Sequence, residues 1–221
     1  MKRGFEFLKL LQENNNREWF QVHKPEYELI KEENSKFFNK IYSELQKHDR
    51  LNKIHISRIY RDIRFSKDKT PYKTNFGAGF SRVKPMLRGG YYLQIGPDSS
   101  FVGGGFWAPN KDDLFRIRKE FEINPDEIQQ ITSDNNFLKY FGKLEGEDGV
   151  KNAPKGFDKT LPAIDLIKKK QFVVRRKFSD QEVLADNFQK EVLLTFLAMR
   201  PFFDYMSEVL TTDQNGESIL E

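Results

Sequence analysis

The sequence contains no cysteine, so the chain can form neither a disulfide nor a thiolate metal site, and it has no cysteine nucleophile. Histidine is scarce as well. The three histidines, His23, His48 and His55, have no acid or second histidine at the spacing of metal ligands, so we expect no metal site and no cofactor. A chain without thiols suits a reducing compartment, and the expected location is cytoplasmic.

Long apolar segments are also missing. The longest, from Val192 to Met199, contains Thr195 and is far shorter than the roughly 20 residues that span a bilayer. Near the start of the chain, charges at Glu6, Lys9 and Glu13 interrupt the apolar residues, whereas a secretory segment needs an unbroken apolar run. We therefore expect a soluble protein with no membrane partner.

Motifs of common catalytic and nucleotide-binding sites are absent too. The sequence has no Walker A motif and no nucleophile-elbow motif around a serine. Gly77 and Gly79 begin like a dinucleotide fingerprint, but Arg82 occupies the third glycine position. The run from Gly103 to Gly105 predicts a strand bulge or a close approach of two backbones rather than a phosphate-binding loop.

Positive charge is concentrated in two segments. The 221 residues carry a formal net charge of +4, but the segment from Lys47 to Arg88 contains twelve Lys or Arg residues and three Asp, a net of +9. A second basic run, from Lys168 to Lys177, has six cations and no acid. Clustered cations indicate an anionic partner more directly than the total charge does, although lysine runs also occur on ordinary solvated surfaces.

Apolar periodicity predicts helices at both ends of the chain. Phe5, Leu8 and Leu11 recur at helical spacing, and Asn16 can cap a short helix that follows. Pro25 suits the first turn of a longer helix that continues to about residue 48. The remaining predicted helices span 111–122, 125–132, 161–170 and a last helix that opens with a capping box formed by Ser179 and Glu182.

Four segments have the β-branched and aromatic pattern of strands, at 54–65, 90–96, 100–107 and 171–178. Pro97 and Asp98 separate the second and third, which predicts an antiparallel hairpin. Its aromatic residues Tyr92 and Trp107 are candidates for stacking on a base, although such residues more often belong to a core. We predict a single α+β domain over residues 1–210, an antiparallel sheet with helices packed mainly on one face, and a polar tail at 211–221.

Charged residues are densest from Arg58 to Lys73. If residues 54–65 form one strand, its two faces carry alternate residues, with Arg58 and Arg64 flanking Asp62 on one face and Phe65 on the apolar face. The predicted ligand-binding residues are Arg58, Arg61, Arg64, Lys67, Lys69 and Lys73. The candidates for proton transfer are Asp62 and Tyr72.

The same segment reads R-x-x-R-D-x-R-F-x-x-D-K-x-x-Y. Its fixed positions are Arg58, Arg61, Asp62, Arg64, Phe65, Asp68, Lys69 and Tyr72. On this signature the chain resembles a bacterial and fungal family that is catalogued as a domain of unknown function. The resemblance extends to NNNREWF, to GYYLQI followed by a GG segment, and to PKGFD, so it covers most of the chain. It implies no activity, only that the signature residues matter for folding or for binding.

Three functions fit these observations. The first is a module that binds a phosphorylated or other anionic ligand, either a nucleotide or a nucleic acid, through guanidinium and ammonium groups. It predicts affinity that falls steeply with salt and a basic surface that is continuous between residues 58–73 and 168–177, and its nucleic-acid version fails if those segments lie on opposite sides. The second is a structural or interaction protein in which the signature is a salt-bridge network. The third is a metal-independent enzyme acting on a small anionic substrate in a closed pocket. The ligand and the oligomeric state remain open.

Overall fold

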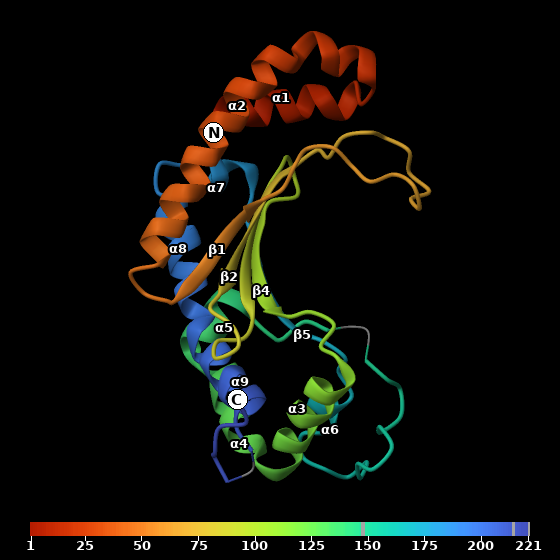
Figure 1. Ribbon diagram of the computed structural model, residues 1–221, viewed down its shortest axis with the longest axis vertical. Coiled ribbons are helices and arrows are strands. Elements are labelled where there is room, and N and C mark those ends of the chain that lie inside the picture. Colours follow the sequence, from red (N-terminus) through yellow and green to blue (C-terminus); the bar gives the residue numbers. More distant parts are fainter. Residues whose placement is uncertain (147–148, 214, 221) are drawn as a thin grey trace.

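An antiparallel sheet runs through the middle of the molecule, with its strands in the order β1-β2-β3-β4-β5 (Figure 1). The computed structural model describes residues 1–146, 149–213 and 215–220. The strands are β1 (Leu51–Ile56), β2 (Phe76–Arg82), β3 (Gly90–Ile95), β4 (Phe101–Phe106) and β5 (Phe172–Lys177). The helices are α1 (Lys2–Glu13), α2 (Arg17–Leu45), α3 (Lys111–Ile123), α4 (Pro125–Ser133), α5 (Asn135–Phe141), α6 (Ile164–Ile167), α7 (Asp180–Leu184), α8 (Phe188–Ala198) and α9 (Arg200–Thr211).

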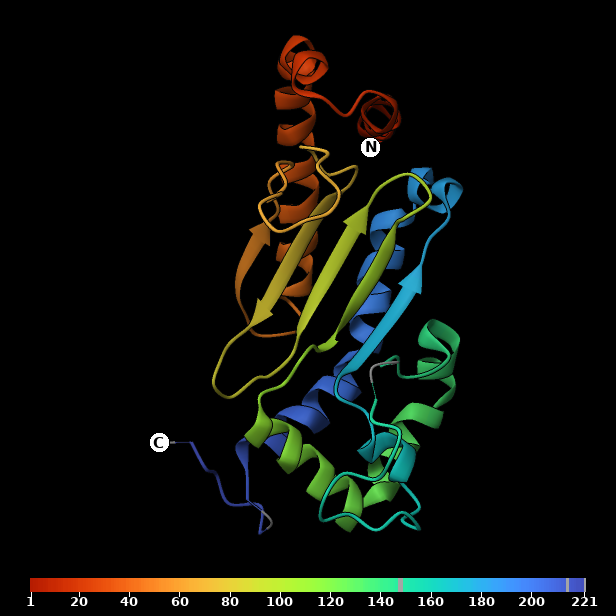
Figure 2. The ribbon, with the colours of Figure 1, turned by 90° about the vertical axis from the view of Figure 1, so that its right-hand side faces the viewer.

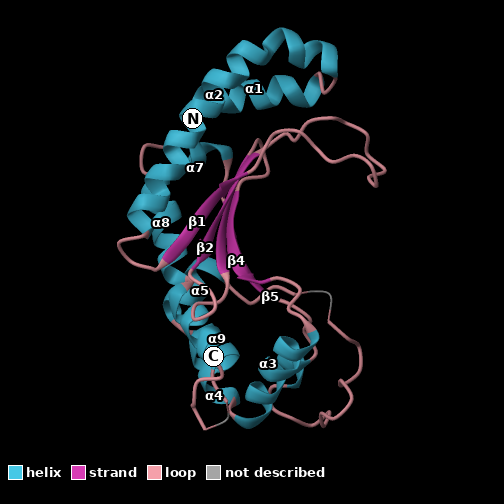
Figure 3. Cartoon of the chain, in the orientation of Figure 1, coloured by secondary structure: helices cyan, strands magenta, loops and turns pink. Residues whose placement is uncertain are grey.

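The two faces of the sheet have different surroundings. Along β3, Tyr91, Leu93 and Ile95 are buried, whereas Tyr92 and Gln94 between them are half-buried. Helices α2 and α8 pack on the buried face (Figure 3). There the ring of Phe80 in β2 lies 6.5 Å from that of Tyr42 in α2 and 5.3 Å from that of Phe196 in α8. Figure 2 looks onto the opposite face, which none of the described helices covers. An antiparallel sheet tolerates this arrangement because its side chains alternate between core and solvent.

We call this uncovered side of the sheet the open face, and it carries the side chains of Lys53, His55, Ser81, Tyr92, Gln94, Phe101, Val173, Arg175 and Lys177. Helices α3 to α6 and α9 form a second layer beyond one end of the sheet, and the α1–α2 pair extends beyond the other end (Figure 1). The loop between β1 and β2 projects on the open side, at the α1–α2 end (Figures 1 and 2).

Much of the predicted secondary structure is confirmed. The α+β architecture, the hairpin of β3 and β4, the helices α1, α3 and α4, and strand β5 lie where the patterns placed them. Ser179 and Glu182 form the predicted capping box, which opens α7. None of the described helices has the length and apolar character needed to cross a bilayer.

Two helix predictions are wrong, and one helix was missed. Pro25 does not open a helix but lies inside α2, which is continuous from residue 17. Phe20 and Tyr27, on either side of the proline, both pack against Phe7, and this contact outweighs one missing backbone hydrogen bond. The predicted last helix is divided into α7, α8 and α9, because the chain is extended at Ala185 and turns again at Met199. Helix α5 was not predicted.

The strand predicted at 54–65 is also wrong, because β1 ends at Ile56. Its partner β2 begins only at Phe76, and the Ser57 N–H donates to the carbonyl of Gly77 at 2.8 Å in the last rung of the ladder. Beyond that rung the chain has no strand to pair with, so residues 57–75 form a long loop. The predicted alternation of signature residues on two sheet faces therefore does not exist, and Phe65, expected on the apolar face, is 95% exposed.

Candidate functional site

The loop of residues 57–75, which we call the signature loop, is held at its base. The Lys73 N–H donates to Ile59 at 2.7 Å, and the Arg61 N–H donates to Pro71 at 2.9 Å. The Tyr72 ring stacks on Phe20 of α2 at a centroid distance of 4.0 Å. The Asn15 side chain donates to the Tyr72 carbonyl and accepts from its N–H, at 3.0 and 3.1 Å. The asparagine run and the signature tyrosine thus dock the loop on the N-terminal helices.

Inside the loop, Arg61 already has a carboxylate partner. Its guanidinium binds Asp68 and the hydroxyl of Thr70. Hydrogen bonds from the backbone and hydroxyl of Thr70, and from Arg61, lower the pKa of Asp68 to about 2. Arg61 and Lys73 line one pocket of about 370 Å³ at the base of the loop, but Asp68 lines it as well. The charge of Arg61 therefore serves to brace the loop.

Arg64 also has a carboxylate partner within the loop. Its Nε and Nη2 donate to the two oxygens of Asp62 at 2.9 and 2.6 Å, and both side chains are exposed. This pairing lowers the pKa of Asp62, which weakens it as a base. Burial raises the pKa of Tyr72, so its hydroxyl stays protonated at neutral pH. Lys69 donates to the carbonyl of Ile63 at 2.9 Å.

The other three predicted ligand-binding residues are Arg58, Lys67 and Lys73. Among the described residues, their side chains make no hydrogen bond or ion pair with the protein. The structure thus divides the six predicted cations. Arg61 and Arg64 are paired with carboxylates of the loop, Lys69 donates to a backbone carbonyl, and the other three are available to a partner.

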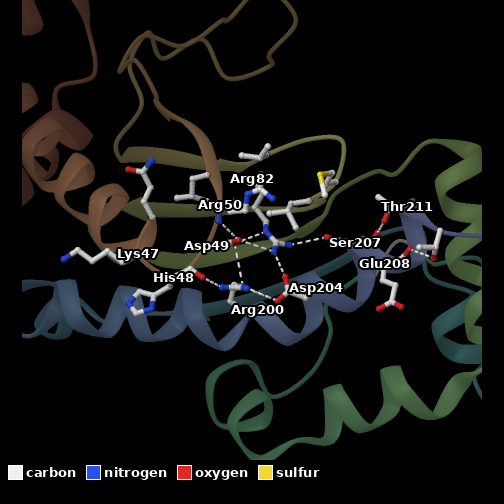
Figure 4. A pocket seen from close by; sticks show the side chains of 16 residues that line it. Lys47, His48, Asp49, Arg50, Arg82, Arg200, Asp204, Ser207, Glu208 and Thr211 are labelled. Carbon is white, nitrogen blue, oxygen red and sulfur yellow. Dashed lines mark hydrogen bonds and ion pairs between the residues drawn. The ribbon is translucent and has the colours of Figure 1, made fainter. Parts of the chain in front are cut away.

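A pocket of about 880 Å³ lies at the opposite end of β1, beside α9 (Figure 4). Arg82 and Asp49 meet at its wall with Nε and Oδ2 2.8 Å apart, and both side chains are almost fully buried. Arg82 also binds Asp204 and the hydroxyl of Ser207, and Arg200 binds Asp204 at 3.0 Å. We call these five residues the buried network.

The buried network satisfies its own charges. Asp49 accepts a hydrogen bond from the Tyr91 hydroxyl, and burial together with that carboxylate raises the pKa of the tyrosine. Arg82 pairs with Asp49 and Asp204, and Arg200 pairs with Asp204 one turn along α9 and donates to the carbonyl of His48. We therefore infer that the buried network has a structural role and holds β1, β2, β3 and α9 together. Sequence reasoning counted Arg82 only as one cation of the +9 segment and did not predict its buried role; its place in the FGAGFSR stretch, after two buried aromatic residues, was the available signal.

The open face differs from the buried network in composition. Glycines line the centre of this face, and two adjoining hollows lie toward its β5 edge. The aromatic hollow, of about 370 Å³, is lined mainly by Gly90, Tyr92, Phe101, Gly103, Gly105 and Trp107. The cationic hollow, of about 520 Å³, is lined by residues that include Trp107, Lys143, Glu145, Lys169, Arg175 and Lys177. Trp107, Val173 and Arg175 line both.

The glycines are required where they lie. A Cβ at Gly77 would be 2.5 Å from the Tyr92 hydroxyl, so the tyrosine ring lies across that glycine. A Cβ at Gly105 would be 2.2 Å from the carbonyl oxygen of Phe172 on the neighbouring strand. The predicted close approach of two backbones is therefore confirmed. At these two glycines the protein itself fills the space of a side chain, whereas a Cβ at Gly79 would meet no atom closer than 4.0 Å, so the backbone of the sheet is accessible there.

The aromatic residues of the open face differ in exposure. Trp107 is 70% exposed, and the next residue, Ala108, has a φ of 45°, which is uncommon for a residue other than glycine. Phe101 packs against Tyr92 at 5.7 Å, and the Arg175 guanidinium lies over its ring at 4.8 Å. Trp107 thus offers a free ring face beside a guanidinium that already lies on an aromatic surface.

The cationic hollow carries an excess of positive charge. Of its described lining residues, Glu145 alone is acidic, and it lies 3.4 Å from Arg175. Within the described part of the chain Lys143 and Lys177 have no ion pair, and Lys169 has none either but donates to the carbonyl of Leu144 at 3.4 Å. Nowhere in the ranges that the structure describes do three His, Asp or Glu side chains gather as a metal site would require.

The two basic segments lie on the same side of the sheet. β5, which carries Arg175 and Lys177, forms one edge of the open face, and the signature loop projects over the same face beyond β1 (Figure 2). The two segments therefore do not lie on opposite sides of the molecule, the arrangement that would have excluded a nucleic-acid ligand.

Over residues 3–205 the chain matches the model of a protein family described as "Conserved hypothetical protein (DUF2461)". No curated protein and no solved structure matches it.

Proposed function

The chain belongs to this family of conserved hypothetical proteins, and we propose that it binds a phosphorylated ligand on the open face of its sheet. The proposal rests on one observation: an aromatic hollow with a glycine floor adjoins a hollow whose described lining residues include four cations and one acid. A phosphate ester with a planar ring has both kinds of surface. The ring would lie against Trp107, and the phosphate would lie among Lys143, Lys169 and Lys177.

A structural role for part of the signature has its own support. Arg61 with Asp68, and Arg64 with Asp62, form ion pairs within one loop. We propose that these pairs hold the signature loop in shape, while ligand binding depends on cations that have no internal partner. The signature then combines two of the functions that the sequence left open.

Fluorescence titration tests the proposed function. The chain has two tryptophans, so a Trp19→Phe variant leaves Trp107 as the single reporter. Adenosine monophosphate and inorganic pyrophosphate are the probes. We expect saturable quenching by the nucleotide, and Trp107→Ala to weaken nucleotide binding in calorimetry by about fivefold or more, since stacking on one base contributes roughly 1–3 kcal/mol.

Charge variants complete the experiment. Lys177→Gln should weaken the binding of both probes, because a hydrogen bond to a charged group contributes about 1.5–3 kcal/mol. The matched control is Lys40→Gln, which removes an exposed charge from α2 on the other side of the sheet and should change neither affinity. Absence of saturable binding of both probes, or equal losses in the two lysine variants, would contradict the proposal.

A further inference from the structure

The extent of the cationic surface indicates what kind of phosphorylated ligand the open face accepts. We propose that it is a single-stranded nucleic acid, which crosses the sheet from the cationic hollow beside β5 to the signature loop beyond β1. This inference rests on the proposed function and adds the class of ligand and its path.

The first argument is distance. With neighbouring strands about 4.8 Å apart, a five-stranded sheet is roughly 19 Å wide. Lys143 and Lys177 lie at its β5 edge, whereas the free cations of the signature loop, Arg58, Lys67 and Lys73, follow β1 at the opposite edge. One nucleotide cannot contact both groups, but a chain of phosphates can.

The second argument is what lies between the two edges. Lys53 and His55 are exposed on β1, with the glycines of β2 next to them and Tyr92 beyond. Tyr92 and Gln94 provide a ring and an amide in the centre of the face. A path of small residues with interspersed rings and cations is typical of surfaces that bind bases by stacking and the backbone by charge.

The third argument favours a single strand over a duplex. The bases of a duplex are stacked on one another, so the ring of Trp107, which lies beside the aromatic hollow, would have no base face to contact. At the far end of the path, Phe65 is 95% exposed in the signature loop, with the Arg64 guanidinium 5.9 Å from its ring. Exposed rings at both ends of a cationic path suit unpaired bases.

Fluorescence anisotropy with labelled oligonucleotides tests the inference on the full chain. The single-stranded DNA probes are oligothymidylates of roughly four, eight and twelve nucleotides. An oligouridylate and a DNA duplex, each of roughly twelve nucleotides or base pairs, and thymidine monophosphate are compared with them. We expect affinity to increase with length until the strand spans the face, and the duplex to bind more weakly than the single strand. The oligouridylate arm shows whether RNA or DNA binds more tightly.

A loop variant gives the second readout. Replacing Arg58, Lys67 and Lys73 together by glutamine removes three cations that have no internal partner, so the fold should be retained, as circular dichroism would show. The dependence of log affinity on log salt for the twelve-nucleotide probe should become shallower by about 2, at about 0.7 per lost phosphate contact on a single strand. Affinity for thymidine monophosphate should fall far less than affinity for the long probe.

The outcomes separate the two proposals. If mononucleotide and long oligonucleotide bind equally, or the loop variant keeps the full salt dependence, or the duplex binds more tightly than the strand, the inference is overturned while phosphate binding in the cationic hollow stands. If neither the mononucleotide, pyrophosphate nor any oligonucleotide binds, the proposed function fails as well.

Discussion

Replacing Arg82 by methionine would remove the central cation of the buried network while keeping a long, unbranched side chain. Arg82 lies between Asp49 and Asp204 and also donates to Ser207 and to the carbonyl of Arg88. After the change, Asp49 keeps the Tyr91 hydroxyl and an Arg200 guanidinium 3.9 Å away, and its side chain remains only 2% exposed.

The expected loss follows from that geometry. Removing one partner of a buried ion pair leaves the other charge without full compensation, which typically costs about 3–5 kcal/mol of unfolding free energy. In a chain of this length each kcal/mol lowers the melting temperature by about 2–4 °C, so the variant should melt roughly 6–20 °C lower.

Urea unfolding followed by circular dichroism, together with a thermal scan, measures both quantities. The matched control is Arg64→Met, which removes a guanidinium from an exposed pair in the signature loop and should leave the midpoint unchanged. If Arg82→Met lost less than about 1 kcal/mol, the buried network would not join the sheet to α9, and the pocket beside it would again be a candidate site.

Two further predictions concern a glycine and a carboxylate. Gly105→Ala should destabilise the protein more than Gly156→Ala. Both glycines have a positive φ, but only a Cβ at Gly105 would meet the backbone of Phe172. Equal urea midpoints for the two variants would contradict this reasoning. The folded pKa of Asp68, about 2, lies below its unfolded value, so its contribution to stability is present above pH 3.8 and is lost as pH falls toward 2. Carboxyl NMR should show this midpoint, and Arg61→Gln should raise it; a titration near pH 4 in the unaltered protein would show that the brace does not form.

The sequence by itself predicted the features that depend on neighbouring residues. Helix ends at Asn16 and Ser179 follow from side chains that cap nearby N–H groups. The β3–β4 hairpin follows from two alternating segments around a turn, and the glycines of β4 indicated the close backbone approach. The signature was visible as a cluster of charged residues, and the basic run that ends in β5 was visible in the same way.

The tertiary structure alone decided where β1 ends, which face of the sheet is open and which cations are available. Arg82 and Arg58 lie in the same basic segment, yet one is buried against Asp204 and the other is exposed. Trp107 and Lys143 are distant in sequence but line one hollow. Local patterns report the preferences of a short stretch of backbone. Burial and the pairing of charges are instead set by residues that folding brings together from far along the chain, so the candidate site could be read only from the folded molecule.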